Sequence, residues 1–393
     1  MTVPGRAQVA PHREVRLIGF YIFAFAAGGV IQPFLNLYLA EIGLSGAQIG
    51  IMQGWTALAA VALTPFVGVL ADRTQRHRLI LGVIVFVKGL SAALIPFSTA
   101  WPWLLGTVGL RVITAQAQDA IMNQLTLARL KAHNRTNLGM IRFWGALSFA
   151  ATSLLAGLLA RDRSVGVLFP LAGIMGAGAV LFLGGFPARI APPSDDGTPA
   201  RQRRGRRLWP LFIVILVFEL GRSGPETFTY VHLVSGLGAG KDLVGALSGL
   251  SGLVPLAAFA LTDRLLARRG ALTGLALSIG LYSLGCAGLA VLPASLNPRL
   301  ALFPIAAQAF GQSLHLISIV ILLGALGSSA HAATNQALAQ LAIPGLARLA
   351  AQPISGWLFD AAGGSVLFAA DALIGLVAVG LLMLWGRERI VSP

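Results

Sequence analysis

Ionisable side chains stand inside segments that are otherwise apolar, and the seventh such segment carries the densest group. Glu219, Arg222 and Glu226 occupy positions i, i+3 and i+7, so on a helix they share one face. Two carboxylates and a guanidinium in this arrangement can pair with each other, hydrogen-bond a polar solute and exchange a proton. The alternative is a self-neutralised cluster that only stabilises helix packing.

Four further charged side chains extend this pattern to other segments. Arg111 and Asp119 lie eight residues apart, on nearly the same face of the fourth segment, and Arg142 opens the fifth. A guanidinium is suited to bind hydroxyls or an acid, and a carboxylate partner can orient it. Alternatively, Arg142 reaches the nearest polar surface. Arg348, in the eleventh segment, is expected to balance the excess acid of the seventh.

The spacings that an enzyme or an ATP-driven pump needs are missing. The chain has no GxxxxGK[ST] motif for phosphate, no HExxH motif and no Cys/His metal spacing, and its only cysteine is Cys286. No nucleophile and base stand at a suitable spacing either. We therefore expect no enzymatic activity, no cofactor and no metal site.

The composition identifies the setting of these charges as a membrane. Of the 393 residues, 56% are hydrophobic and 11% charged, and the mean hydropathy is +0.79, whereas soluble domains carry about 25% charged residues. The chain has room for twelve membrane-spanning helices of about 20 residues each. An ionisable residue inside a span costs about 2.5 to 3.5 kcal/mol, so each one needs a partner, a water-filled cavity or a role.

The predicted fold is an all-α membrane protein of twelve transmembrane helices in two six-helix bundles. The expected spans are Arg16–Leu39, Ala47–Leu70, Leu79–Phe97, Trp103–Leu125, Leu138–Ala160, Val165–Phe186, Leu208–Leu233, Leu243–Leu261, Leu272–Leu292, Leu300–Leu323, Ala332–Gly356 and Val366–Trp385. A polar stretch with two prolines and an arginine cluster interrupts the series. It divides the chain into an N-terminal bundle (1–186), a basic cytoplasmic linker (187–207) and a C-terminal bundle (208–393).

The charge distribution predicts the orientation. Alternate loops, together with both chain ends, hold 20 Lys and Arg residues, whereas the opposite loops hold 4. Because basic residues concentrate on cytoplasmic loops, both termini are expected in the cytoplasm of a plasma-membrane protein. The basic cytoplasmic loops account for the formal charge of +15, so this charge does not indicate a nucleic-acid partner. We expect no protein partner either.

A loop motif is repeated in the two halves. GVLADRTQRHR (Gly68 to Arg78) follows the second span, and AFALTDRLLARR (Ala258 to Arg269) follows the eighth. The first resembles the cytoplasmic loop signature of the major facilitator superfamily, with Gln75 and His77 as departures. The residues that carry the conformational motif are Gly68, Asp72, Arg73 and Arg76, with Asp263 and Arg264 in the second copy.

Three other stretches resemble one branch of that superfamily, the lactose, nucleoside and phenylpropionate permeases. They are FLNLYLAEIGLSGAQIG (34–50), IRFWGALSF (141–149) and QPISGWLFDAAGG (352–364). The resemblance implies a twelve-helix carrier of small organic solutes that works by alternating access.

The resemblance also implies roles for single residues. Arg142 matches an arginine of the sugar site that interacts with an acid of the fourth helix, and the resemblance implies Asp119 as that acid here. Phe149 stands where the family has a tryptophan that stacks on the sugar ring. His315 matches a histidine involved in proton coupling, whereas Ser318 replaces an acid. Proton coupling would therefore fall on four groups: Asp119, Glu219, Glu226 and His315. Alternatively, His315 is a packed, hydrogen-bonded side chain.

Two further polar residues lie in the first and the last predicted spans. Asn36, in the first span, is expected either to bind the solute or to be satisfied by a neighbouring helix. Asp371, in the twelfth span, is interpreted as a packing or loop-anchoring group.

Together these features predict a secondary active transporter of a small organic solute (a sugar, nucleoside or aromatic acid). The expected mechanism is proton-coupled uptake by alternating access, in contact with the lipid bilayer and driven by the proton gradient. The fifth span lacks the Gly-x-x-x-Gly-Pro run of many drug antiporters, which favours uptake. An efflux carrier for drugs or sugars is the main alternative, and a non-transporting membrane sensor is a remote one.

Overall fold

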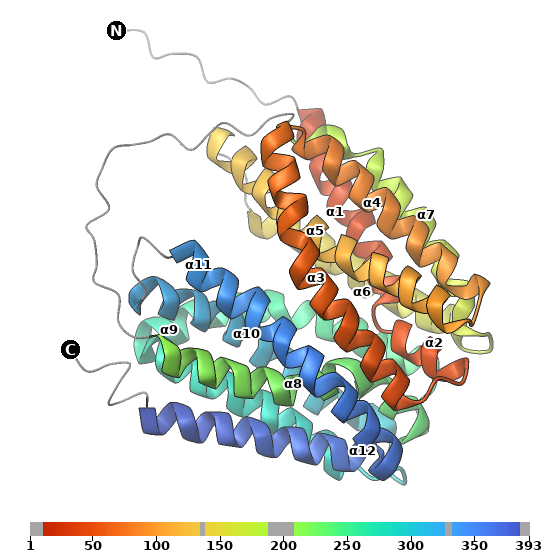
Figure 1. Cartoon of the computed structure of the whole chain (residues 1–393), viewed down its shortest axis with the longest axis vertical. Coiled ribbons are helices and arrows are strands. Elements are labelled where there is room, and N and C mark those ends of the chain that lie inside the picture. Colours follow the sequence, from red (N-terminus) through yellow and green to blue (C-terminus); the bar gives the residue numbers. More distant parts are fainter. Residues whose placement is uncertain (1–10, 134–137, 188–207, 327–331, 386–393) are drawn as a thin grey trace, which may run out of the picture.

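The computed structural model describes residues 11–133, 138–187, 208–326 and 332–385. The regular structure in these ranges is helical. Figure 1 shows two helical bundles, one built from the first half of the chain and one from the second. The predicted linker falls almost entirely outside the described ranges.

The bundles contain long helices joined by short turns. The first bundle holds α1 (Pro11–Ile31), α2 (Leu35–Glu41), α3 (Gly46–Thr74), α4 (His77–Leu94), α5 (Trp101–His133), α6 (Leu138–Ala160) and α7 (Leu168–Val180). The second holds α8 (Trp209–Ser235), α9 (Lys241–Val291), α10 (Leu302–Leu326), α11 (Ala332–Ala337) and α12 (Ile343–Trp385). A π-helical turn, Leu338–Ala342, joins α11 to α12.

Breaks and bends convert these helices into the twelve predicted spans. The chain breaks at Pro33, between α1 and α2, which form one span. Gly270 (φ 79°) bends α9 and Gly363 (φ 81°) bends α12, so each of these helices supplies two spans. Both glycines adopt the left-handed backbone conformation that side chains disfavour. The fold predicted from the sequence is confirmed.

Each bundle has its own apolar interior. In the first, α1 packs against α6 and α7, and α4 lies against α5 and α7. In the second, α10 packs against α9, and α12 packs against α8 and α9. Large side chains such as Phe20 and Phe368 are completely buried in these interiors, whereas many leucines remain on the outer surface, as expected for helices that contact lipid.

The two bundles contact each other along two seams, α3 against α12 and α6 against α9. The seams lie at the end of the molecule near α2 and the bend of α12, and the bundles diverge toward the other end (Figure 1). We call the divergent end the basic face, because it carries Arg73, Arg76, Arg78, Arg264, Arg268 and Arg269. The other end is called the opposite face.

Small residues let the backbones approach at the seams. A Cβ added to Gly356 would lie 2.6 Å from the carbonyl carbon of Gly46. A Cβ on Gly157 would lie 2.9 Å from the Cα of Gly245 in the second seam. Because real Cβ atoms do not come so close to backbone, these positions need glycine for the opposite face to close.

Candidate functional site

A cavity of about 630 Å³ lies between the bundles. It is lined by seven residues singled out from the sequence: Asn36, Phe149, Glu219, Arg222, Glu226, His315 and Arg348. Such a volume fits one small organic molecule. The break of α1 at Pro33 and the position of Pro225 inside α8 both border this cavity, as expected where irregular backbone faces water.

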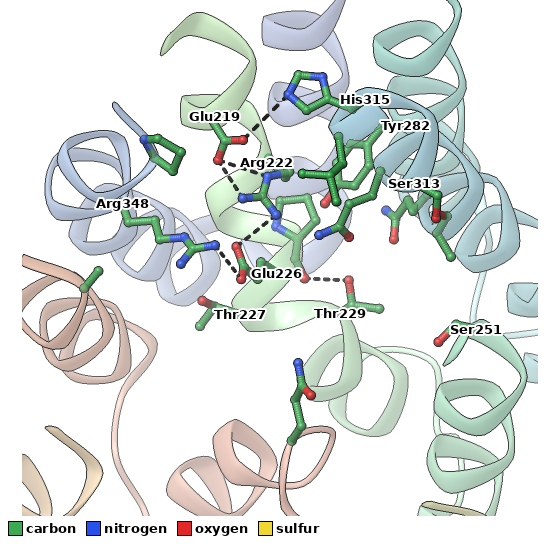
Figure 2. A pocket seen from close by; sticks show the side chains of 18 of the residues that line it. Glu219, Arg222, Glu226, Thr227, Thr229, Ser251, Tyr282, Ser313, His315 and Arg348 are labelled. Carbon is green, nitrogen blue, oxygen red and sulfur yellow. Dashed lines mark hydrogen bonds and ion pairs between the residues drawn. The ribbon is translucent and has the colours of Figure 1, made fainter. Parts of the chain in front are cut away.

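A continuous chain of charged side chains forms one wall (Figure 2). Arg222 Nη2 lies 2.6 Å from Glu219 Oε2, and Arg222 Nη1 lies 3.4 Å from Glu226 Oε2. Glu226 Oε1 accepts a hydrogen bond of 2.8 Å from Arg348 Nη2. His315 Nε2 lies 3.9 Å from Glu219 Oε1, and its ring packs on Phe218 with 4.3 Å between ring centroids. We use the name charged chain for five of these residues: Glu219, Arg222, Glu226, His315 and Arg348.

The positive and negative charges within the charged chain are equal in number. Its two carboxylates and two guanidinium groups pair with one another, and the side chains of Glu219 and Arg222 are 6% and 8% exposed. A buried charge without a partner is costly, so the pairs are needed wherever water is excluded. The only titratable member beyond these four is His315.

The remainder of the cavity is neutral but rich in hydrogen-bonding groups. The second bundle adds hydroxyl groups and carboxamides from Thr229, Tyr230, Ser248, Ser251, Tyr282, Gln308, Gln312, Ser313 and Gln340. The first bundle adds a mostly apolar wall of Ala57, Ala60, Val61, Val112 and Phe149, with Gln32 and Gln116. The polar binding groups are therefore concentrated in the second bundle.

Arg142 and Asp119 do not line the cavity. Both side chains are exposed, and no ion pair within 4.0 Å joins them among the described residues. Asp119 instead lies within electrostatic range of Lys88 in α4, which in turn interacts with Arg111. The sequence resemblance places Arg142 and Asp119 in the solute site, whereas this conformation places them outside it.

Asn36 belongs to a polar chain that the sequence did not indicate. Its amide donates to the carbonyl of Thr227 in the other bundle (3.0 Å) and its Oδ1 accepts from Gln53 (2.5 Å). Thr227 donates to Gln352 Oε1 (2.6 Å), whose amide donates to the Ser223 carbonyl (3.0 Å). These neutral residues carry no charge that would mark them in an apolar segment, although Thr227 follows Glu226 directly.

Comparison with known proteins agrees with this architecture. Residues 14–370 match the family model described as the MFS_1 like family. The chain belongs to this family, part of the major facilitator superfamily. It is therefore a multi-pass membrane transporter of that type.

The transporter resembles curated proteins over part of its length. It is 26% identical to the uncharacterized transporter YwbF of Bacillus subtilis over 63% of both chains. It is 32% identical to the maltose permease of Geobacillus stearothermophilus over 38% of both chains. The matched region thus spans less than two thirds of either relative. A crystal structure of the nucleoside transporter NupG has a TM-score of 0.83 at 15% identity, with 97% of this chain and 100% of that chain covered, which shows the shared fold.

The loop motif of this transporter lies at the basic face. Asp72 Oδ1 lies 2.9 Å from Nε2 of the buried His77, while Arg73 and Arg76 are exposed. Open space surrounds Gly68, so this position does not require glycine for packing in this conformation. In the second copy Arg264 is exposed, and the side chain of Asp263 lies outside the described residues.

Two polar contacts join the bundles of the transporter at the opposite face. Asp360 in α12 accepts hydrogen bonds from the backbone N–H groups of Gly46 (2.7 Å) and Ala47 (2.9 Å) at the start of α3. Lys241 at the start of α9 pairs with Glu41 (2.5 Å) and donates to the Arg163 carbonyl (2.7 Å). A carboxylate at a helix N-terminus is favoured by the helix dipole and the free N–H groups. We call these contacts the two latches.

Proposed function

We propose that this protein takes up a small, uncharged, polyhydroxylated solute together with protons. The observation that carries the proposal is the cavity between two bundles, in which every cation of the charged chain is already paired with a carboxylate. A solute with hydroxyl groups can share hydrogen bonds with paired guanidinium and carboxylate groups without breaking their balance.

The same geometry supports two of the three solute classes expected from the sequence, the sugar and the nucleoside. An aromatic acid would need a free cation, but Arg222 and Arg348 are each held by a glutamate of the cavity. A sugar or nucleoside would place its hydroxyls against the second bundle and a ring face against Phe149. The printed names of a maltose permease and a nucleoside transporter among the similar proteins agree with this choice.

The orientation follows from the charge on the basic face. If this face is cytoplasmic, as positively charged loops favour, the closed opposite face is external and the structure faces inward. Uptake then requires both seams to open outward and to close again around the solute, with the two bundles rocking about the cavity. The membrane in this proposal is the plasma membrane.

Proton coupling is proposed through the charged chain. Among the four groups expected from the sequence, Glu219 and His315 are the adjacent pair in the cavity. A proton on Glu219 would weaken its pair with Arg222 and free the guanidinium to bind a hydroxyl of the solute. Asp119 lies outside the cavity and has no contact with this chain of pairs in the described structure.

The experiment is a solute pulse to weakly buffered, de-energised cells that express the protein. We expect the external pH to rise transiently with one sugar or nucleoside and to stay constant with aromatic carboxylates and in control cells. A transient with carboxylates alone would overturn the solute class. A fall in pH, or no accumulation of any solute, would favour the efflux alternative.

Substitutions in the two latches are expected to shift the conformational equilibrium of the carrier, and this can be measured in the same cells. We expect Lys241→Gln and Asp360→Asn each to shift the carrier up to about fivefold toward the outward-open state, because a polar contact near the surface contributes about 0.2 to 1 kcal/mol. The measurement is labelling of a cavity cysteine (Ala57→Cys) by an impermeant maleimide from outside. Arg299→Gln removes an exposed cation from the same face and serves as the control; equal rates in all variants would refute the latch role.

A further inference from the structure

Two titratable side chains lie outside the cavity, in the packed surface between α8 and the second half of α12. His232 is 3% exposed and Asp371 is 5% exposed. Within the described part of the chain, Asp371 Oδ2 lacks a hydrogen-bond partner, whereas the His232 ring interacts with the backbone of Leu289. Buried polar atoms are nearly always paired, so this unpaired oxygen requires an explanation.

Asp371 differs from the other buried acid of the structure. Glu219, with a similar exposure, is paired with Arg222. No cation lies within 4.0 Å of Asp371 among the described residues, and its buried Oδ2 accepts no hydrogen bond. An ionised carboxylate without a partner is far more costly to bury than a neutral carboxyl group. The neutral, protonated form of Asp371 therefore fits this conformation.

No charged side chain is available near Asp371 to stabilise its ionised form. From α9, Tyr282 and Cys286 lie within its electrostatic range, and both are neutral at ordinary pH. The charged residues on α8 and α12 are engaged elsewhere: Glu219, Arg222, Glu226 and Arg348 pair with one another, and Asp360 caps α3.

Asp371 is coupled mechanically to the helix that carries the charged chain. A Cβ added to Gly224 would lie 2.5 Å from Asp371 Oδ2, and one added to Gly221 would lie 3.0 Å from the Asp371 carbonyl oxygen. Pro225, next to Gly224, lies inside α8 and lines the cavity. Ionisation of Asp371 would draw in water and push α8 away from α12, because nothing else can solvate the charge there.

His232 lies about two helical turns from Asp371 along both helices. It packs on Phe368, with ring centroids 5.2 Å apart, and it contacts Gly364, whereas Asp371 meets Gly224. No ion pair within 4.0 Å joins His232 to Asp371 among the described residues, so the imidazole leaves the carboxyl group without a polar partner.

We propose that Asp371 is a second proton-binding site of the carrier, and that its protonation permits α8 and α12 to close together. Water that reaches the carboxylate when the two helices separate supplies the proton that neutralises it, and takes the proton back when the carboxyl group ionises. The coupling part of this inference rests on the proposed proton-driven uptake, whereas the proton-binding part stands by itself.

Infrared spectroscopy of the purified full-length protein tests the proton-binding part with no solute present. We expect the carbonyl stretch of a protonated carboxyl group at neutral pH in the wild type and in Glu219→Gln, its loss in Asp371→Asn, and its return in Asp371→Glu. Asp162→Asn, an exposed acid, is the control. Absence of the band in the wild type, or its survival in Asp371→Asn, would overturn the proposal.

Transport assays then test the coupling part. Asp371→Asn should exchange solute across the membrane at the wild-type rate but fail to accumulate it, and its uptake should lose its dependence on external pH. Normal accumulation in this variant would refute a coupling role. If the wild type itself shows no pH-dependent uptake while the infrared band belongs to Asp371, proton-coupled uptake fails and the protonated site remains.

Discussion

Replacing Arg222 by glutamine is expected to lower uptake by at least about 100-fold, which corresponds to about 2.7 kcal/mol. Arg222 is the only residue of the charged chain that contacts both Glu219 and Glu226. Without it, Glu219 remains 6% exposed with no cation beside it, and an orphaned buried charge of this kind costs about 3 to 5 kcal/mol. The measurement is initial uptake of the solute found in the pH assay, together with thermal unfolding of the purified protein.

Matched variants separate charge balance from solute contact. The double variant Glu219→Gln, Arg222→Gln removes one charge of each sign and should regain thermal stability but not uptake. Arg222→Lys keeps the positive charge but loses the planar fork that reaches both carboxylates, so its uptake should remain at least tenfold low. Wild-type uptake in the double variant would show that the pair serves only to stabilise the helices.

The fold was predictable because its cause is the composition of the spans. Apolar stretches of about 20 residues can only be helices in a membrane, where each backbone polar group must be satisfied within its own segment. The bends at Gly270 and Gly363 fall in the stretches 262–271 and 357–365, which separate predicted spans. The sequence did not predict that helix would continue up to each glycine from both sides, so that one long helix supplies two spans.

The site was predictable where charge marks a residue. Glu219, Arg222, Glu226 and Arg348 are conspicuous because a charge inside a span demands a partner, and the structure brings them together. Gln53, Thr227 and Gln352 were missed because neutral polar residues are common in such helices. The positions of Arg142 and Asp119 could not be derived either, since their distance from the cavity depends on the conformation of the two bundles.

Closure of the opposite face depends on direct contact between the backbones of α3 and α12, and one added side chain should prevent it. In Gly356→Leu the new side chain meets the backbone of Gly46 and Ala47, where the nearest Cα is 3.0 Å from the position of Cβ. Backbone cannot move aside as a flexible side chain can, so α3 and α12 must separate. We expect uptake to fall below about 1% of wild type, with external labelling of Ala57→Cys at least tenfold faster.

Gly380→Leu is the matched control, because it lies on the same helix and a Cβ there meets open space. Unchanged labelling with lost uptake would indicate a folding defect, whereas normal uptake would show that the α3 and α12 contact is dispensable. The prediction thus tests whether the state with a closed opposite face belongs to the transport cycle.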